Sequence, residues 1–199
     1  GWAFNADVDA VRTRNFRWNI GANATLIKNT IKTLPEQNRE EGIINGTKKY
    51  LEGHGIYDYF MYQYAGVDMM TGRCLYEFND KDYYIGDAQE GKEEVPAEYA
   101  VNINGKPYVL KTTYAKKDWS GSALPKVFGS FNTGFTWKDL TLSALVTYQF
   151  GSKVVDYMYQ TYVTASGSPH AYHADLTKAW SGVPAGMTED SPNRIDHPQ

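Results

Sequence analysis

The chain contains one close pair of histidines that could bind a metal ion. His170 and His173 are three positions apart, so both could lie on one face of a helical turn, and Asp175 could add a carboxylate ligand. Solvated histidines in a polar loop are the simpler interpretation of this pattern. His54 lies between two glycines and is expected in a turn. We therefore predict no metal site.

Acidic side chains form two adjacent pairs, Glu40–Glu41 and Glu93–Glu94, and a looser group of Asp80, Asp82 and Asp87. A glycosidase needs two carboxyl groups that face each other across a sugar, whereas adjacent strand residues point to opposite faces. The three aspartates lack the spacing and the final Glu of an EF-hand loop. No Ser–His–Asp order, glycine-rich phosphate loop or H-E-x-x-H motif occurs. We expect no catalytic residue, no cofactor and no enzymatic activity.

Three aromatic residues in a long polar stretch are the candidate ligand-binding residues. The rings of Tyr83, Tyr84 and Trp119 could stack on sugar rings or pack against a partner protein. Packing within the loop itself is the alternative, and the residues alone leave both interpretations open.

Composition excludes one function class and favours two others. The 199 residues include 20 Lys and Arg against 23 Asp and Glu, so a formal net charge of −3 gives no electrostatic basis for binding nucleic acid. The single cysteine, Cys74, excludes an intrachain disulfide. Aromatic residues make up 15% of the chain. Such a content is typical of outer-membrane barrels and of aromatic-rich β-sandwiches.

Apolar and polar residues alternate in four runs that must form the framework of the protein. Residues 2–10 and 16–26 make one pair, and residues 127–137 and 140–150 make a second pair joined at Lys138-Asp139. A period of two predicts strands with one apolar and one polar face. The short breaks within each pair predict antiparallel hairpins.

The polar faces of the later hairpin favour a barrel over a soluble sandwich. They carry Thr, Ser, Asn, Gln and Gly, with Leu145 as the exception, and no charged residue occurs within 127–137 or 140–150. Strands of about 10 residues also have the length that a tilted strand needs to cross a bilayer. We predict an all-β fold, an antiparallel transmembrane β-barrel segment of about six strands. A soluble β-sandwich that binds carbohydrate is the alternative.

The other elements are expected between and after the hairpins. Residues 56–65 and 75–78 predict a further strand pair, and weak alternation continues through 157–163. From 165 to 199 the chain is expected to be loop-like, with a helical patch around 175–180.

The connections between the expected strands differ in length in a regular way. Short connections at 13–15, 66–73 and 138–139 alternate with long, polar ones at 32–55 and 79–125. Periplasmic turns alternate with extracellular loops in outer-membrane barrels in the same manner.

Four aromatic residues suit the boundary between membrane and water. Trp2, Trp18, Trp137 and Tyr148 fall on the apolar faces of the expected strands. Their rings combine an apolar body with a polar edge, so we predict that they form a membrane girdle or face lipid.

Four segments carry motifs of a known transporter family in matching order and spacing. Residues 1–31 contain F-x-W and N-x-x-x-x-x-N-x-I motifs, although Ala3 departs from the family's usual opening. Residues 51–72 contain E-G followed by Y-A-G-V-D-x-x-T-G, and the segments 121–126 (GSALPK) and 150–154 (FGSKV) follow. In these motifs the chain resembles the SusC/RagA-type TonB-dependent transporters of the bacterial outer membrane.

The resemblance implies a location, a function and partners. Members of this family close about 22 strands around a plug. By this resemblance, residues 1–199 belong to the C-terminal half of such a barrel, without signal peptide, plug or final strands. A strand pattern already present at residue 2 agrees with a chain cut from a longer one. The implied role is import of a large nutrient, an oligosaccharide or a peptide.

The implied partners are outer-membrane lipid, a SusD-like surface lipoprotein, and TonB acting through the missing N-terminal part. We expect the long loop 79–125 to contact the lipoprotein or the substrate.

Overall fold

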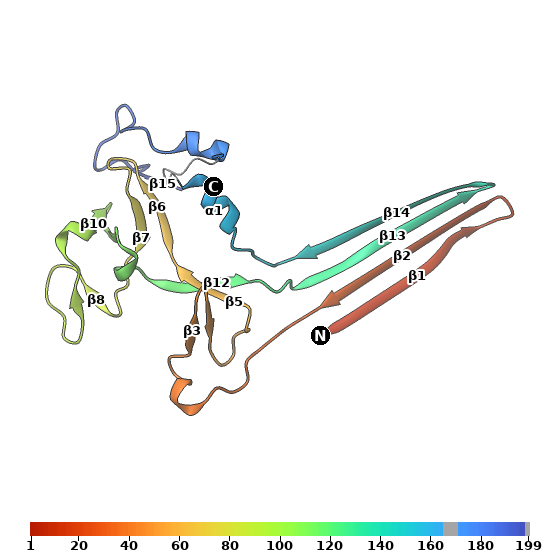
Figure 1. The fold of residues 1–199 in the computed structure, drawn as a ribbon, viewed down its shortest axis with the longest axis horizontal. Coiled ribbons are helices and arrows are strands. Elements are labelled where there is room, and N and C mark those ends of the chain that lie inside the picture. The colour runs from red at the N-terminus through yellow and green to blue at the C-terminus, as the bar shows by residue number, and fades with distance from the viewer. Residues whose placement is uncertain (165–170, 198–199) are drawn as a thin grey trace. The chain divides into compact units, whose positions relative to one another are not determined.

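The computed structural model describes residues 1–164 and 171–197, and these residues form a predominantly β structure (Figure 1). The chain divides into two compact units. The first comprises Gly1–Phe60 and Trp119–Val154, and the second comprises Met61–Asp118 and Val155–Gln199. The predicted all-β fold built on antiparallel barrel-type hairpins is confirmed. Among the described residues, no helix is both long and apolar enough to pass through a membrane.

Four long strands of the first unit form one sheet, which we call the wall sheet. They are β1 (Trp2–Arg12), β2 (Phe16–Leu26), β13 (Val127–Trp137) and β14 (Leu140–Phe150), each 11 residues long. Their order is β1-β2-β13-β14, and every neighbouring pair is antiparallel. The two predicted hairpins therefore lie side by side, with both turns at the same end of the sheet (Figure 1). These four strands and two turns agree with the sequence prediction.

The register of the wall sheet assigns each side chain to one of two faces. Residues directly opposite each other on paired strands point to the same side of a sheet. Phe131 lies opposite Ala22 on one side and Val146 on the other, whereas the next residue, Asn132, lies opposite Gly21. Each strand therefore contributes most of its apolar residues to one face and most of its polar residues to the other, with Phe128, Thr133 and Leu145 as exceptions.

The two tight turns are held by local hydrogen bonds. The Thr13 amide donates to the Phe16 carbonyl at 2.7 Å, and the Phe16 amide donates to the Thr13 hydroxyl at 3.0 Å. Lys138 has a φ of 52°, the left-handed conformation that closes a two-residue hairpin turn. Its amide donates to the Asn15 carbonyl at 2.9 Å, so the turns of the two hairpins are also linked to each other.

Four short strands form a smaller sheet. It has the order β12-β5-β4-β3. Its strands are β3 (Ile43–Asn45), β4 (Lys48–Tyr50), β5 (Asp58–Tyr62) and β12 (Lys117–Ser122), and a 3-10 helix, η1 (Glu36–Asn38), lies before them. Residues 32–55, expected as a loop, thus contain a short hairpin.

The second unit is built on a sheet with the order β10-β11-β7-β6-β15. Its strands are β6 (Tyr64–Asp68), β7 (Cys74–Glu77), β10 (Ala100–Ile103), β11 (Lys106–Val109) and β15 (Ile195–Asp196). The buried apolar side chains among the described residues all belong to this unit; they are Ala65, Leu75, Val95, Ile103, Tyr108, Val109 and Ala115. The second unit therefore has a hydrophobic core of its own.

The prediction of one long loop over residues 79–125 is corrected by the structure. This segment contains β8 (Tyr83–Tyr84) paired in parallel with β9 (Glu93–Glu94), two 3-10 helices, η2 (Ala97–Tyr99) and η3 (Thr112–Tyr114), and the strands β10, β11 and β12. The β10–β11 hairpin turns at Asn104 and Gly105, which have φ angles of 52° and 79°. An Asn-Gly pair is a strong local hairpin signal, because both positions of such a turn need positive φ.

The expected single strand at 56–65 is two strands in different sheets. β5 ends at Tyr62 and β6 begins at Tyr64. The amide of the Gln63 side chain, at the break, donates to the carbonyls of Met61 and Asp118 at 2.9 and 3.3 Å. The return strand at 75–78 is present as β7, which pairs with β6.

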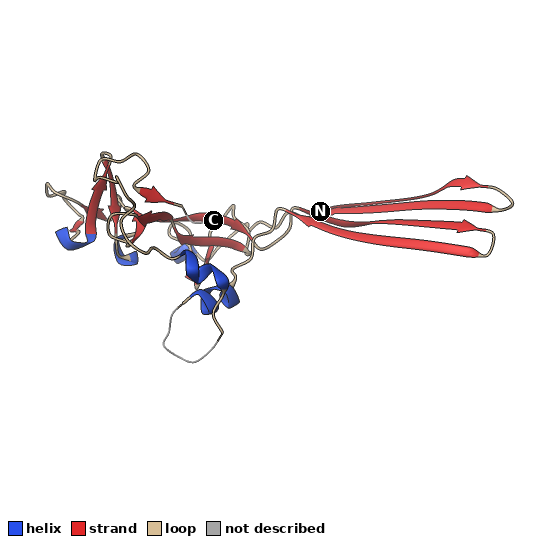
Figure 2. Cartoon of the chain, turned by 90° about the horizontal axis from the view of Figure 1, so that it is seen from above, coloured by secondary structure: helices blue, strands red, loops and turns tan. Residues whose placement is uncertain are grey.

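The weak alternation over residues 157–163 does not form a strand. Tyr157–Val163 form the helix α1, drawn in blue in Figure 2. The Asp156 carboxylate accepts the Tyr159 amide at 2.8 Å and so caps the first turn, which a strand pattern in the sequence does not reveal. The helical patch expected near 175–180 is present as the 3-10 helix η4 (Ala174–Lys178).

Gly129 is a point of close contact within the wall sheet. The Tyr148 hydroxyl reaches across this glycine and donates to the Asn23 carbonyl at 2.9 Å. A Cβ atom at residue 129 would overlap that carbonyl oxygen and lie 2.7 Å from the Tyr148 hydroxyl. Gly134 on the same strand differs, because a Cβ there would meet only the end of the Asn19 side chain.

We expect Gly129→Ala to lower the free energy of unfolding by about 1–3 kcal/mol, the usual cost of overpacking, since a backbone carbonyl cannot move aside. Gly134→Ala is the matched control and should cost less, because the Asn19 side chain can rotate. Thermal unfolding of the two variants measures the difference. Equal losses would show that the close contact at Gly129 does not constrain the sheet.

Candidate functional site

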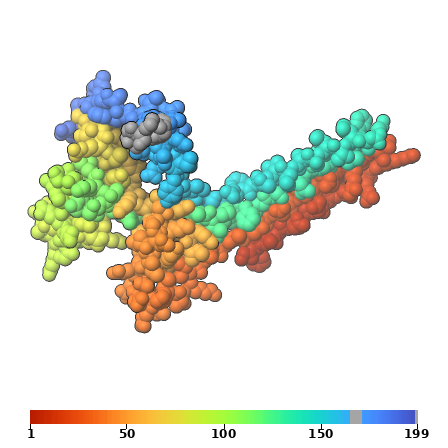
Figure 3. All heavy atoms as spheres, in the orientation of Figure 1, coloured from red at the N-terminus to blue at the C-terminus, as the bar shows by residue number. Residues whose placement is uncertain are grey.

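The apolar face of the wall sheet is exposed along its whole length. On the edge strand β14, Leu140, Leu142 and Val146 are 67%, 66% and 58% exposed, and Phe4 and Val8 of β1 are 58% exposed each. The four strands form one continuous band of atoms (Figure 3). Soluble monomers rarely leave an apolar surface of this extent uncovered. The chemistry of this face therefore fits a hydrocarbon environment or a protein partner.

The predicted girdle residues lie at both ends of this apolar face. Trp2 begins β1 and Tyr148 lies near the end of β14, so these two side chains are at the end opposite the turns. Trp18 and Trp137 lie at the other end, next to the turns. The residues between the two ends are mostly small or aliphatic, with Phe131 and Thr133 of β13 as exceptions. Aromatic residues at both ends of an apolar band are typical of a barrel wall in a bilayer. A girdle role for these four residues stays a prediction.

Two of the girdle candidates also make polar contacts within the sheet. The Trp18 ring stacks on Phe135 with 5.4 Å between ring centroids, and its Nε1 donates to the Thr133 hydroxyl at 2.9 Å. The Tyr148 hydroxyl donates to Asn23, as described above. Each ring therefore keeps its polar edge satisfied while its apolar body stays on the apolar face.

The polar face carries side chains that bond to one another across the strands. Arg17 donates two hydrogen bonds to the Asp9 carboxylate, each 3.1 Å long. The Asn23 amide donates to the Ser130 hydroxyl at 2.6 Å. These contacts leave a neutral to weakly charged polar surface, which suits contact with water and polar solutes.

A cleft in the first unit, the Trp119 cleft, has a volume of about 420 Å³. The side chains that define its chemistry are His54, Asp58, Trp119, Ser122, Lys126 and Lys153. The His54 and Trp119 rings are stacked, with centroids 3.7 Å apart and an interplanar angle of 5°. The Asp58 carboxylate accepts the Gly55 amide at 2.8 Å and lies 4.0 Å from Nδ1 of His54.

Each of the two lysines of the Trp119 cleft packs against a glycine: Lys153 against Gly121, and Lys126 against Gly151. Gly121 and Gly151 have φ angles of 104° and 82°, which L-residues with side chains rarely adopt. A Cβ atom on Gly121 would lie 2.8 Å from Cδ of Lys153, and one on Gly151 would lie 3.0 Å from Cγ of Lys126. The segments GSALPK and FGSK thus pack reciprocally, each glycine beneath the lysine stem of the other.

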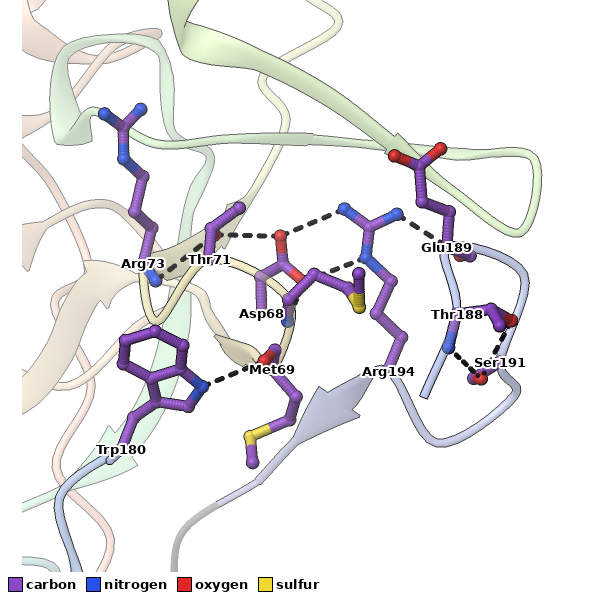
Figure 4. Close-up of polar contacts among 10 residues, drawn as sticks. Asp68, Met69, Thr71, Arg73, Trp180, Thr188, Glu189, Ser191 and Arg194 are labelled. Carbon is purple, nitrogen blue, oxygen red and sulfur yellow. Dashed lines mark hydrogen bonds and ion pairs between the residues drawn. The ribbon is translucent and has the colours of Figure 1, made fainter. Parts of the chain in front are cut away.

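A buried ion pair joins the end of the chain to the β6–β7 hairpin in the second unit (Figure 4). Nε and Nη2 of Arg194 donate to the two oxygens of Asp68 at 2.8 and 3.0 Å. Asp68 is 1% and Arg194 9% exposed. The Met70 amide and the Thr71 hydroxyl also donate to Asp68, at 3.0 and 2.9 Å. The V-D-x-x-T-G motif therefore forms a turn in which the Asp68 carboxylate accepts hydrogen bonds from the turn itself and from Arg194.

The surroundings of Asp68 determine its protonation. Burial alone would raise the pKa of this carboxyl group, but the hydrogen bonds from Arg194, Met70 and Thr71 outweigh burial and hold the pKa below its ordinary value of 3.8. The pKa of Arg194 is raised in turn, chiefly by its hydrogen bond to Asp68. Both groups are therefore charged at neutral pH.

Trp180 covers the turn that carries this ion pair. Its Nε1 donates to the Met69 carbonyl at 2.9 Å (Figure 4). A Cβ atom on Gly72 would overlap the Trp180 ring, so the ring lies directly on the glycine. The final glycine of the motif thus provides the surface for an aromatic ring.

The candidate ligand-binding aromatics do not form one group. Tyr83 and Tyr84 belong to β8 in the second unit, whereas Trp119 belongs to the first unit. Tyr83 packs edge-on against Tyr114, with 5.1 Å between centroids. Burial raises the pKa of its phenol, and the nearby Glu93 and other charges add to the effect. Tyr83 thus packs within the second unit, and Trp119 is the member of the three that lines the Trp119 cleft. A ligand-binding role for Tyr83, Tyr84 and Trp119 stays a prediction.

The candidate metal ligands have other partners where the structure describes them. His170 lies outside the described residues. Nδ1 of His173 accepts the Asp175 amide at 3.1 Å, and the Asp175 carboxylate lies 2.6 Å from Nζ of Lys178 and accepts the Tyr159 hydroxyl at 3.1 Å. Within residues 1–164 and 171–197, no three His, Cys, Asp or Glu side chains are grouped as metal ligands.

Sequence reasoning missed most of the Trp119 cleft and the ion pair. Lys126 and Lys153 were visible only as members of family-like motifs, and His54 only as part of a turn. The Asp68–Arg194 pair spans 126 positions and leaves no local pattern.

We expect Arg194→Met to lower the free energy of unfolding by about 3–5 kcal/mol at pH 7, because it leaves Asp68 buried and charged without its partner. Since the folded-state pKa of Asp68 lies below its ordinary value, the stability from the pair is present above that value and is lost as the pH falls through the folded-state pKa. The difference between wild type and variant should therefore shrink toward pH 3.

Urea unfolding at both pH values measures this effect, and Lys178→Met is the matched control. Lys178 is 77% exposed, so its pair with Asp175 is screened by water and should contribute little to stability. The buried ion pair would not have the stabilising role described if Arg194→Met lost no more unfolding free energy than the control. A loss that is independent of pH would contradict it as well.

Comparison with solved structures shows which fold this chain shares. Over 94% of its length it superimposes on 20% of a chain in the "Structure of the RagAB peptide transporter", with a TM-score of 0.64 and 16% sequence identity. A second structure of that importer, in an "open-open" state, gives a TM-score of 0.62 at 16% identity, over 95% of this chain and 19% of the other. A "closed-closed" state gives 0.50 at 20% identity over 75% of this chain.

These similarities concern the fold and a limited part of the larger proteins. The chain spans about a fifth of the length of the transporter chains that it resembles. No protein-family model and no curated protein matches the sequence. The chain thus shares the fold of one segment of the RagAB transporter chains.

Proposed function

We propose that this chain forms part of the wall of a SusC/RagA-type transporter in the bacterial outer membrane and that it has no enzymatic role. The observation that carries the proposal is the wall sheet. Four antiparallel strands of 11 residues expose one continuous apolar face and present a polar face on the other side. Tilted strands of this length cover the apolar band of about 25 Å found in outer-membrane barrels.

The edges of the wall sheet support its placement in a larger barrel. β1 and β14 are the outer strands of the described sheet, and their 11-residue edges are long and exposed. Such edges promote aggregation in a soluble protein, whereas closure of a barrel pairs them. A soluble carbohydrate-binding sandwich would instead bury the apolar face against a second sheet.

The turns support an orientation in the membrane. Both tight turns lie at one end of the wall sheet, and residues 27–126 connect β2 to β13 at the other end. Outer-membrane barrels have short turns on the periplasmic side and long connections outside. We therefore place residues 27–126 on the extracellular side, together with residues 151–153, which complete the Trp119 cleft at the same end of the sheet.

The cargo that we propose is a large nutrient. The structural neighbours are described as peptide transporters, which favours a peptide, and the family resemblance of the sequence also allows an oligosaccharide. In this proposal a SusD-like lipoprotein binds on the extracellular side, where residues 79–125 contribute contacts to it or to the cargo. TonB would act through another part of the full-length protein.

The location is tested by fractionating the envelopes of the source bacterium and probing them with an antibody to this chain. We expect a band in the outer membrane that is far larger than the 22.5 kDa of this chain. A soluble band near that size would overturn the proposal in favour of the sandwich.

The orientation of the two faces is tested with arginine at adjacent positions of β14 in the full-length protein. Val146 belongs to the apolar face and Thr147 to the polar face. Val146→Arg should destabilise the barrel by about 2–4 kcal/mol, because its charge would lie near the middle of the bilayer. Thr147→Arg should be nearly neutral, since its charge stays in water.

Urea unfolding in lipid vesicles, together with the amount of each variant assembled in the outer membrane, measures this difference. Similar effects of the two substitutions would exclude lipid contact on the apolar face.

A further inference from the structure

The Trp119 cleft carries two positive charges and one negative charge. Within the described residues, Lys126 and Lys153 form no ion pair with a carboxylate, although both line the cleft. The acid of the cleft, Asp58, is already bonded to the Gly55 amide and lies beside His54. An anionic group entering the cleft would therefore meet two ammonium groups that have no competing carboxylate partner.

The backbone holds both lysines at fixed positions. The Lys126 amide donates to the Phe150 carbonyl at 2.9 Å, and the Lys153 amide donates to the Ser122 carbonyl at 2.8 Å. Their stems lie over Gly151 and Gly121, so the first part of each side chain is held as well. Less side-chain entropy is then lost when a ligand binds than for a fully mobile surface lysine.

The third component of the cleft is an apolar wall. Trp119 is stacked with His54 and contacted edge-on by Phe60 at 5.3 Å between centroids. A volume of about 420 Å³ lies in the range of pockets that hold small organic ligands. The cleft thus offers an aromatic surface beside a pair of cations.

We propose that the Trp119 cleft binds the carboxylate of a ligand through the ammonium groups of Lys126 and Lys153, with an apolar or ring-shaped part of the ligand against Trp119. The inference deepens the proposed function and rests on it for the role of this ligand as cargo. Binding itself does not require that the protein transports anything.

Two kinds of cargo present this chemistry. The C-terminal residue of a peptide has a free carboxylate next to its side chain, and a uronic acid has a carboxylate on a sugar ring. In both, the carboxylate lies a few bonds from an apolar or flat surface, which matches the position of the two lysines beside Trp119.

The experiment measures binding by titration calorimetry to the purified full-length protein. The probes are the tripeptide Ala-Ala-Phe and its C-terminal amide, and digalacturonate and neutral galactobiose. We expect one of the acids to bind at least about tenfold more tightly than its neutral counterpart, because a charge-assisted contact is lost in the latter. The preferred acid identifies the source of the carboxylate.

The variants assign the binding to this cleft. Lys126→Met and Lys153→Met keep the apolar stem and remove the charge. Each substitution should therefore lower the affinity for the acidic probe to that of its neutral counterpart. Lys126→Arg and Lys153→Arg should largely restore binding. Lys32→Met removes an exposed charge elsewhere in the first unit and should have no effect.

Several results would overturn the inference. The inference fails if acidic and neutral probes bind equally, or if neither acid binds measurably. It also fails if both methionine variants bind the acid as tightly as the wild type. Envelope fractionation is independent of these titrations. A soluble protein that binds the acid through the two lysines would refute transport and leave the cleft assignment intact.

Discussion

Pairing of β2 with β13 is the interaction on which the first unit depends. It joins two local hairpins, more than a hundred positions apart in the sequence, in one unbroken register over all 11 residues. Because side chains alternate with a period of two, a slip of one residue would move every apolar side chain of a hairpin to the polar face. The exposed apolar surface, the two aromatic ends and the row of polar contacts all follow from this register.

The same register creates the Trp119 cleft. Val127 lies opposite both Leu26 and Phe150, so the segments before β13 and after β14 leave the sheet at one end. Only there can Lys126 lie over Gly151 and Lys153 over Gly121. The cleft with its charged groups therefore lies beyond the end of the strands that carry the apolar face.

The second unit is stabilised in a different way. It has a core of buried apolar side chains around Leu75 and Val109, both 0% exposed, whereas the wall sheet leaves its apolar residues uncovered. The short strand β15 adds only two residue pairs to the sheet. The Asp68–Arg194 pair holds this end of the chain, which makes it a connection between distant segments as much as a source of stability.

The sequence by itself determined the four long strands, their turns and their two faces, because alternation and turn propensity are local properties of consecutive residues. It also contained the Asn104-Gly105 turn, although the surrounding charges suggested a loop. Only the tertiary structure decided that residues 157–163 form a capped helix, and that Tyr83 packs while Trp119 lines a cleft. The cleft and the Asp68–Arg194 pair join side chains far apart along the chain, and such contacts depend on strand order and register, which no local pattern encodes.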